Sequence, residues 1–343
     1  MDKSDIKSMY PKELKEFFES IGERSFRADQ VFKWLHGGAT AFEEMTDLSQ
    51  TLRGKLEQEF YITVPELAEK QASTLDGTVK YLWRLSDGSA IESVVMDYVH
   101  GNTVCISTQV GCRMGCAFCA SAIGGLVRNL AASEMLDQVL FSELDSGKKI
   151  SNVVLMGIGE PLDNFENVVR FLKLLTHPDG INIGARHISL STCGIVEMID
   201  KLSEYGIQLT LTVSLHAPDD ETRSRLMPVN RGDGVGKLLD ACRRYFRKTG
   251  RRVSFEYSLI DGVNDTERHS ILLASTLKKT GGHLNLILLN SVPEHPLRAS
   301  GTERVKAFTR VLKNQGINYT VRRSLGGDID ASCGQLRRRM LMS

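Results

Sequence analysis

The chain has 343 residues, of which 41% are hydrophobic and 25% are charged, so it can bury a sizeable core in one large and one smaller domain. Its formal net charge of +1 excludes a strong overall attraction to nucleic acid, and an RNA partner would have to be held by local patches. No apolar run approaches the roughly 18 residues that a membrane span requires. The seven cysteines fit a reducing compartment better than a disulfide framework, and we therefore expect a soluble, cytoplasmic protein.

Residues 1–65 are predicted to form a helical accessory domain. Apolar residues recur there at helical spacing in three stretches that short polar joints separate. Lys33, Arg53 and Lys55 lie in this region and could meet the phosphates of an RNA, although a solvated helix face explains the same pattern. We expect this domain to bind RNA and to lie outside the catalytic core.

Residues 66–103 change to the two-residue period of β-strands. Val79, Tyr81 and Trp83 alternate with other residues, a Ser-Asp-Gly-Ser turn follows, and an extended pattern then resumes. This arrangement predicts a short β-hairpin extension. Glu92 lies among apolar residues of the second strand, where an exposed position at a sheet edge is its ordinary explanation.

From residue 104 to residue 343, extended and helical segments alternate. The predicted strands are 104–109, 152–157, 187–192, 209–215, 253–259 and 284–289. Six βα units in series predict an α/β fold in which a parallel sheet curls into a partial (βα)6 barrel. In such folds the reacting residues lie on the loops at the carboxyl ends of the strands.

Three cysteines follow the first predicted strand at the spacing C-x3-C-x2-C. Cys112, Cys116 and Cys119 can present three thiolates to three irons of a [4Fe–4S] cluster, which leaves the fourth iron open. A closed zinc site would need a fourth nearby ligand, and none follows at zinc spacing. Three buried core cysteines are the alternative. The spacing, with Phe118 before the third cysteine, resembles the signature of radical S-adenosylmethionine (SAM) enzymes.

The other unusual polar clusters also fall at predicted strand ends. They are Gly157 to Pro161 after the second strand, Ser191 to Gly194 after the third, Ser214 to His216 after the fourth and Asn290 after the sixth. Because the carboxyl ends of parallel strands meet at one face of the sheet, these clusters predict a single shared site.

The C-terminal segment carries Cys333 with glycines on both sides, which would let a loop approach a ligand closely. A buried, inert thiol is the alternative. We expect Cys193 and Cys242 to be structural. The densest basic run, 243–248, is best explained as a solvated helix end, whereas Arg322, Arg323 and residues 337–339 flank Cys333 and are better candidates for phosphate contacts.

Motifs along nearly the whole chain resemble the RlmN/Cfr family of radical SAM RNA methyltransferases, and its RlmN branch in particular. They are FRA at 26–28, MTDLS at 45–49, QVGC at 109–112, GGLVRNL at 124–130, GEP at 159–161, SLHAP at 214–218, DIDA at 328–331 and CGQL at 333–336. The resemblance implies methylation at C2 of adenine 2503 in 23S rRNA and of adenine 37 in tRNA.

The resemblance also implies roles for individual residues. Cys112, Cys116 and Cys119 would hold the cluster, Cys333 would carry a methyl group, Cys105 would be its partner thiol, and Glu92 would be the proton acceptor. The positions that match SAM contacts are Gly159, Glu160, Ser191, Ser214, Leu215, His216 and Asn290.

The implied reaction uses two SAM molecules per turnover. One methylates Cys333, and the second, cleaved at the cluster, yields a radical that takes hydrogen from that methyl group. The resulting methylene adds to the adenine, Glu92 removes the ring proton, and Cys105 attacks the sulfur of Cys333 to release the product through a disulfide. The adenine must be unstacked, which favours a single-stranded or loop substrate. An electron donor of the flavodoxin or ferredoxin type and a monomeric enzyme are expected.

Two alternatives stay open at this stage. A Cfr-like enzyme would methylate C8 of the same rRNA adenine with the same cysteines, and a non-catalytic iron–sulfur protein would bind RNA or sense redox state. Two local departures from the family pattern are Cys193 and the absence of prolines beside Asn290, and they concern details of the SAM pocket.

Overall fold

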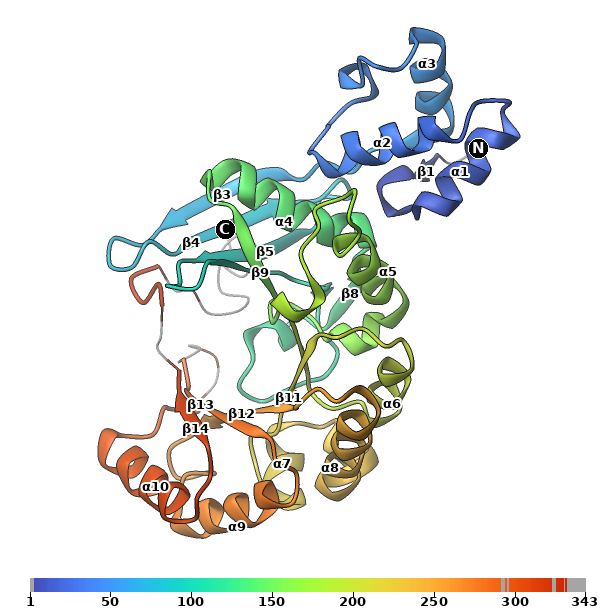
Figure 1. Cartoon of the computed structure of the whole chain (residues 1–343). Helices are drawn as coiled ribbons and strands as arrows, with labels where there is room; N and C mark the ends of the chain where they lie inside the picture. The colour runs from blue at the N-terminus through green and yellow to red at the C-terminus, as the bar shows by residue number, and fades with distance from the viewer. Residues whose placement is uncertain (1–2, 291–293, 295, 323–324, 330, 332–343) are drawn as a thin grey trace.

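A curved sheet of ten strands organises the fold, with helices on its outer face and a helical module at one end (Figure 1). The computed structural model describes residues 3–290, 294, 296–322, 325–329 and 331. None of the helices in this part of the chain combines the length and the hydrophobicity needed to cross a lipid bilayer.

The parallel part of the sheet confirms the predicted partial barrel. Its strands, in spatial order, are β6 (Asn102–Cys105), β9 (Ile150–Leu155), β10 (Ile188–Thr192), β11 (Thr210–Ser214), β12 (Ser254–Leu259), β13 (His283–Leu288) and β14 (Tyr319–Val321). Each pairs in parallel with its neighbour, so all seven carboxyl ends meet at one rim of the sheet. β14 adds one strand to the six βα units that the sequence indicates.

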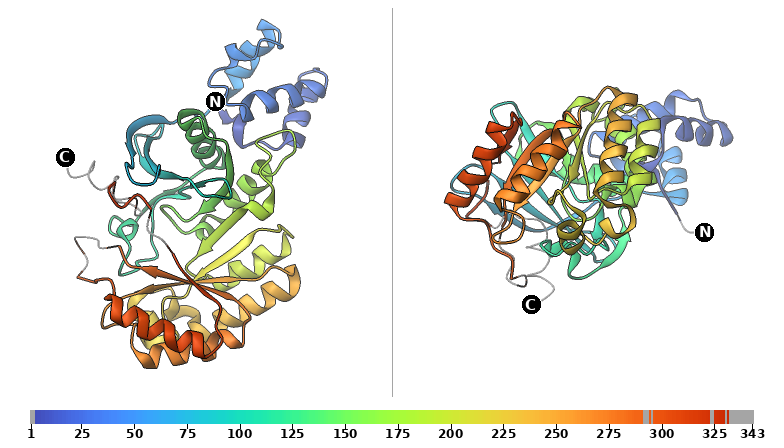
Figure 2. Two further views of the ribbon diagram at one scale, coloured as in Figure 1. Left: turned by 60° about the vertical axis from the view of Figure 1, so that its left-hand side comes forward. Right: turned by 90° about the horizontal axis from the view of Figure 1, so that it is seen from below.

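Helices connect these strands and cover the outer face of the sheet (Figure 2). They are α4 (Ala132–Ser146), α5 (Phe165–Leu175), α6 (Val196–Glu204), α7 (Asp220–Leu226), α8 (Asn230–Thr249), α9 (Glu267–Lys278) and α10 (Thr302–Asn314). In α5, Val168, Phe171, Leu172 and Leu175 recur at helical spacing and are fully buried against the sheet. The apolar stripe therefore fixes which side of this helix faces the core.

The hairpin extension is present and continues the same sheet on the other side of β6. β4 (Val79–Arg84) and β5 (Ala90–Met96) pair antiparallel, and β5 pairs antiparallel with β6. A further strand, β3 (Glu66–Ala72), forms the sheet edge beside β4. Its sequence, ELAEKQA, is polar and half exposed, so no alternating pattern marked it as a strand.

The first predicted strand is divided in the structure. β6 ends at Cys105, and β7 (Gln109–Gly111) leaves the main sheet to pair with β8 (Leu126–Asn129). The Ser107 side chain accounts for the break, because its hydroxyl donates to the Glu92 carbonyl (2.7 Å) and accepts from the Ile158 amide (3.0 Å). The small β7–β8 sheet holds the two ends of the cysteine loop together.

The N-terminal module contains α1 (Pro11–Ser20), α2 (Phe26–His36) and α3 (Gln50–Glu59), closed by short parallel strands β1 (Ser4–Asp5) and β2 (Phe60–Tyr61). Lys7 anchors the module to α4 through an ion pair with Asp137 (2.6 Å), and both side chains are buried. A second contact joins Glu13 to Arg170 on α5 (2.6 Å). The helical accessory module is therefore docked on the outer helices, away from the rim of the sheet (Figure 1).

Candidate active site

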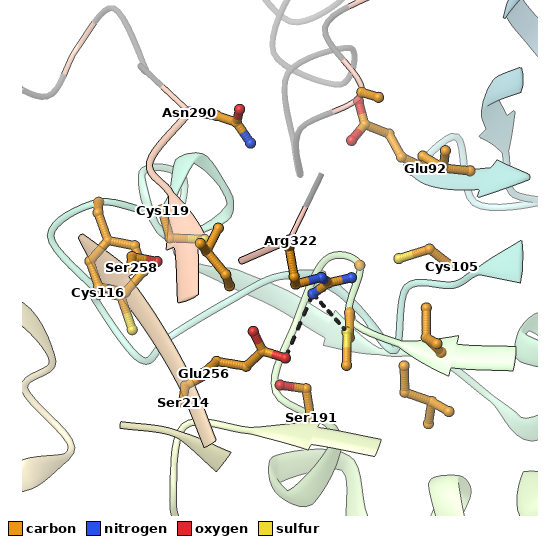
Figure 3. A pocket seen from close by; sticks show the side chains of 18 of the residues that line it. Glu92, Cys105, Cys116, Cys119, Ser191, Ser214, Glu256, Ser258, Asn290 and Arg322 are labelled. Atoms are coloured by element: carbon orange, nitrogen blue, oxygen red, sulfur yellow. Dashed lines mark hydrogen bonds and ion pairs between the residues drawn. The ribbon is translucent and has the colours of Figure 1, made fainter. Parts of the chain in front are cut away.

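A cavity of about 520 Å³ opens at the rim where the parallel strands end. Eleven of the thirteen residues to which the family resemblance assigns a role line it, namely Glu92, Cys105, Cys112, Cys116, Cys119, Gly159, Glu160, Ser191, Ser214, His216 and Asn290. Leu215 is buried and does not form part of the cavity wall, and Cys333 lies outside the described residues. The structure thus brings together residues from seven strands and the loops that follow them (Figure 3).

The cysteine loop is fixed by its own backbone and by packing. The Cys112 amide donates to the carbonyl of Gly125 (3.0 Å), and the Ala117 amide donates to the carbonyl of Leu226 (2.9 Å). Cys116 and Phe118 pack on a small apolar cluster that includes Met227. Phe118 also contacts the ring of His216 edge to face, at 4.8 Å between centroids. The loop therefore lies against the ends of β11 and β12.

The three thiols fit an iron–sulfur cluster. Burial raises the pKa of Cys112 to about 11 and also raises that of Cys116, as expected for neutral thiols without a bound cation. Across the described residues, no three Cys, His, Asp or Glu side chains are close enough to hold a single metal ion. The three thiols are nevertheless close neighbours, because Cys119 raises the pKa of both Cys112 and Cys116, and a cubane takes one thiolate at each of three separate irons.

Glu160 is held rigidly beside the cysteines. Its carboxylate accepts from the Leu162 amide (3.0 Å) and from the Cys193 amide (2.7 Å), and its own amide donates to Gln109 (2.9 Å). Burial raises its pKa, and these hydrogen bonds oppose that shift. Gly159 precedes it with a φ of 108°, and a Cβ there would lie 2.6 Å from Cβ of Gln109. Only glycine fits this position.

Cys193 has a supporting role that the sequence did not reveal. Its side chain hydrogen-bonds to Glu160 in addition to the backbone contact, and it lines the cavity. Burial raises the pKa of this thiol well above its usual value. These surroundings agree with the interpretation of Cys193 as a structural cysteine, and its position in the cavity wall agrees with the predicted shared site.

His216 follows β11 and has a strained backbone conformation. Its φ of 53° lies in the left-handed region that non-glycine residues rarely adopt. Nδ1 accepts from the Ser258 amide (2.9 Å), and the His216 carbonyl accepts from Asn264 (2.7 Å). Burial lowers the pKa of this histidine to about 3, so the ring is neutral and acts as an acceptor.

Arg223 on α7 connects two loops of the site and was not predicted. Its guanidinium donates to the carbonyls of Cys193 (2.6 Å), Ser214 (3.0 Å) and Leu215 (3.0 Å), and to the side chain of Asn230 (2.9 Å). These carbonyls follow β10 and β11. One buried cation therefore fixes the spacing of two strand ends that each contribute to the cavity.

Glu92 and Cys105 lie on neighbouring strands at the opposite side of the cavity from the cysteine loop (Figure 3). Glu92 is buried on β5, with its carboxylate 3.8 Å from the Lys80 ammonium of β4. Burial raises the pKa of Cys105 to about 11, while Arg322 lowers it and Glu92 raises it further. A sheet-edge position for Glu92 is wrong, because β4 and β6 flank β5 on both sides.

Two further charged groups line the cavity. Glu256 on β12 is 4% exposed, and its Oε1 lies 3.6 Å from the guanidinium of Arg322 and 3.2 Å from Nδ2 of Asn285. Its Oε2 has no hydrogen-bond partner among the described residues. Burial raises the pKa of this carboxyl, and Arg322 opposes the shift. The available signal was a glutamate between two aromatic residues in a predicted strand, in the stretch SFEYSL.

The basic run at 243–248 lies on α8, on the outer face. Arg243 pairs with Asp240, Arg244 pairs with Asp200 (2.6 Å), and Lys248 lies 3.3 Å from Glu204. Tyr245, one of the two aromatic residues of the run, is buried in the core. These contacts agree with the interpretation of a solvated helix face.

Family models match two parts of the chain. The model of the radical SAM superfamily matches residues 106–274, and that of the ribosomal RNA large subunit methyltransferase N-terminal domain matches residues 4–62. A radical SAM methyltransferase from Sphaerobacter thermophilus has a similar solved structure, with a TM-score of 0.91 and 43% identity, covering 97% of this chain and 98% of that one. The fold and the site therefore define a radical SAM enzyme.

Curated relatives narrow this class. A "Probable dual-specificity RNA methyltransferase RlmN" from Thermoanaerobacter sp. (strain X514) is 50% identical over 338 residues, 98% of each chain. A protein of the same description from Alkaliphilus oremlandii (strain OhILAs) is 49% identical over the full length of both chains. The chain belongs to the RlmN family of radical SAM RNA methyltransferases.

Proposed function

We propose that the protein methylates C2 of an adenine in 23S rRNA and in tRNA, at adenine 2503 and adenine 37 respectively. Its curated relatives are described as dual-specificity RNA methyltransferases, which supports both substrates. The observation that carries the proposal is the position of Glu92 and Cys105 in the same cavity as Cys112, Cys116 and Cys119. A protein that only bound RNA would have no need for a buried base and a spare thiol beside a cluster loop.

Cys112, Cys116 and Cys119 would hold one [4Fe–4S] cluster, and the open side of the cavity beside Gly159, Glu160, Ser191, Ser214, His216 and Asn290 would receive SAM. When bound, the cluster and SAM supply the radical that removes hydrogen from a methyl group. Two SAM molecules would be used per turnover, with one as the methyl donor. Leu215 would contribute through its backbone, because its side chain is buried.

The chemistry at C2 explains the two additional thiols. This carbon is electron-poor and has no lone pair, so it cannot displace the methyl group of SAM directly. Cys333 would carry the methyl group to the ring, Glu92 would take the ring proton, and Cys105 would release the product by thiol exchange. Lys80, with its ammonium 3.8 Å from the Glu92 carboxylate, would hold that carboxylate in place.

RNA would contact more than the cavity. We propose that residues 1–65 act as an RNA-binding accessory domain, that 66–103 form an extension of the sheet, and that 104–343 form the catalytic core. Exposed lysines on the N-terminal module, with Arg323 and the arginines at 337–339, would contact phosphates, whereas Arg322 pairs with Glu256 in the cavity. A monomeric cytoplasmic enzyme that takes electrons from a flavodoxin- or ferredoxin-type donor fits this scheme.

The decisive experiment is peptide mass analysis of the cluster-loaded protein after anaerobic incubation with SAM. We expect a methyl or methylene group on Cys333. An unmodified Cys333 would overturn the methyl-carrier role, while mapping of the methylated RNA base would separate methylation at C2 from methylation at C8.

A further inference from the structure

An ion pair between Arg322 and the buried Glu256 lies in the cavity, between the cysteine loop and Cys105 (Figure 3). Arg322 follows β14 and its amide donates to the Leu286 carbonyl of β13 (2.9 Å), which fixes its backbone. Its guanidinium lies 3.6 Å from Oε1 of Glu256, and Asn285 donates to the same oxygen (3.2 Å). The side chain of Arg322 is therefore held inside the cavity rather than on an outer surface.

The guanidinium reaches the side of the cavity where Cys105 lies. Nη1 is 3.9 Å from the sulfur of Met156, the residue that follows β9. Cys105 pairs with Val154 of the same strand, and the backbone of Met156 hydrogen-bonds to the Cys105 thiol. Arg322 and Cys105 thus both contact Met156.

The charged groups around Cys105 have opposite effects on the pKa of its thiol. Glu92 from β5 disfavours a thiolate at this position, and Lys80 from β4 compensates part of the Glu92 charge. Glu256 from β12 pairs with Arg322 through its Oε1 atom. Arg322 is the cation that lowers the pKa of Cys105, against the effect of burial. A nearby cation favours the thiolate over the neutral thiol, and the thiolate is the form that attacks another sulfur atom.

We propose that Arg322, held by Glu256, is a positioning residue that stabilises the thiolate of Cys105 when this thiolate attacks the sulfur of Cys333. The inference rests on the proposed function. In this step an S–S bond forms between Cys105 and Cys333, and the bond from the Cys333 sulfur to the methylene carbon breaks. The electron pair of that bond passes to the carbon, which takes up a proton. The two cysteines are oxidised to a disulfide, and the methylene becomes the methyl group of the product.

The test measures the reactivity of Cys105 without RNA or turnover. The reduced, cluster-loaded protein, carrying Cys333→Ala to prevent disulfide formation, is treated anaerobically with iodoacetamide between pH 7 and 10. Alkylation of Cys105 is followed by peptide mass analysis. Arg322→Met and Arg322→Gln remove the charge, Arg322→Lys keeps it, and Arg310→Met on the exposed face of α10 is the matched control.

At pH 8 we expect Cys105 to react about tenfold more slowly in the Met and Gln variants, as a rise of about one unit in its pKa would give. The Lys variant should recover most of the rate, and the control should match the parent. An unchanged pH profile in both neutral variants would overturn the inference. The assay involves no methylation, so this result would leave the proposed function standing. Conversely, an unmodified Cys333 in the wild-type protein would count against the proposed function, but it would not change the alkylation profile of Cys105.

Discussion

Arg223 shows how a single residue can determine the geometry of the site. It is 1% exposed and donates to three backbone carbonyls and one amide oxygen. Burial lowers its pKa from the usual value, and the surrounding carbonyl groups satisfy the guanidinium in place of water. Its function is to hold the loops after β10 and β11, and no motif of the sequence marked it.

Replacing Arg223 with Met should leave those carbonyls without partners and separate the two loops. We expect the free energy of unfolding to fall by about 3 kcal/mol and the Kd for SAM to rise at least about tenfold. Urea unfolding and equilibrium binding of SAM to cluster-loaded protein measure the two effects. Arg225→Met, two residues along the same helix and exposed, is the control. Equal SAM affinity in both variants would contradict the proposed function of Arg223.

His36 makes stability sensitive to acid. It is 6% exposed on α2, stacks on Phe32 at 4.0 Å between centroids, and neither ring nitrogen has a hydrogen-bond partner among the described residues. Burial lowers its pKa to about 3. The unfolded chain, with a histidine pKa of about 6.5, binds the proton more readily. The folded state therefore loses stability as the pH falls below about 6.5, and the loss continues to about pH 3.

His36→Leu should remove this dependence. Between pH 7 and pH 5 we expect the wild-type protein to lose about 2 kcal/mol more stability than the variant, since each pH unit below about 6.5 costs about 1.4 kcal/mol. Urea unfolding at both pH values gives the comparison, and His100→Leu at an exposed turn controls for the loss of one histidine. The same acid sensitivity in His36→Leu and the wild type would refute this account.

At the scale of elements, the buried ion pair between Lys7 and Asp137 joins the N-terminal module to the barrel. Lys7 also donates to the Thr63 carbonyl (2.7 Å), and the Asp5 carboxylate accepts from Ser133 on α4 (2.6 Å). Burial raises the pKa of Asp137 to about 6, while Lys7 opposes the shift. Removing one partner leaves a buried charge uncompensated, which costs more than removing both.

The single variants Lys7→Met and Asp137→Leu should each lose about 3–5 kcal/mol of stability, whereas the double variant should lie within about 2 kcal/mol of the wild type. Urea unfolding of the four proteins forms the double-mutant cycle. Losses that simply add in the double variant would show that the two charges do not depend on each other.

At the scale of the whole molecule, the basic residues occupy two different surfaces. Lys33 and Lys55 are exposed on the N-terminal module, where Lys33 lies 3.5 Å from Asp179, and Arg243 and Arg244 pair with aspartates on the outer face of the barrel. Arg53 donates to the Glu43 carbonyl (2.6 Å) and has a structural function. The lysines are therefore the better test of RNA binding by the module.

Lys33→Ala with Lys55→Ala should weaken binding of an RNA substrate by about three- to tenfold at moderate salt and should reduce the salt dependence, because fewer counterions are released. Arg243→Ala with Arg244→Ala should leave the Kd within about twofold. Fluorescence anisotropy at several salt concentrations measures both pairs. A larger effect of the arginine substitutions on the Kd would indicate that RNA binds to the outer face of the barrel instead.

The sequence by itself determined the local parts of this protein. The six strands and their helices follow from hydrophobic period, and the cluster loop follows from cysteine spacing, because both depend on residues close together in the chain. Glu92 and Cys105 were found through the family resemblance, since an isolated glutamate or cysteine in a strand carries no signal of its own.

Only the tertiary structure decided which side chains meet across the sheet. Glu256 faces Arg322, Arg223 joins the ends of β10 and β11, and Lys7 contacts Asp137 across 130 positions. β3 is likewise a strand because β4 offers it an open edge, not because its own residues favour one. Such contacts form when the curved sheet brings distant segments together. In the low dielectric of the interior a charged group without a partner is costly, and the order of residues along the chain does not specify which group that partner is.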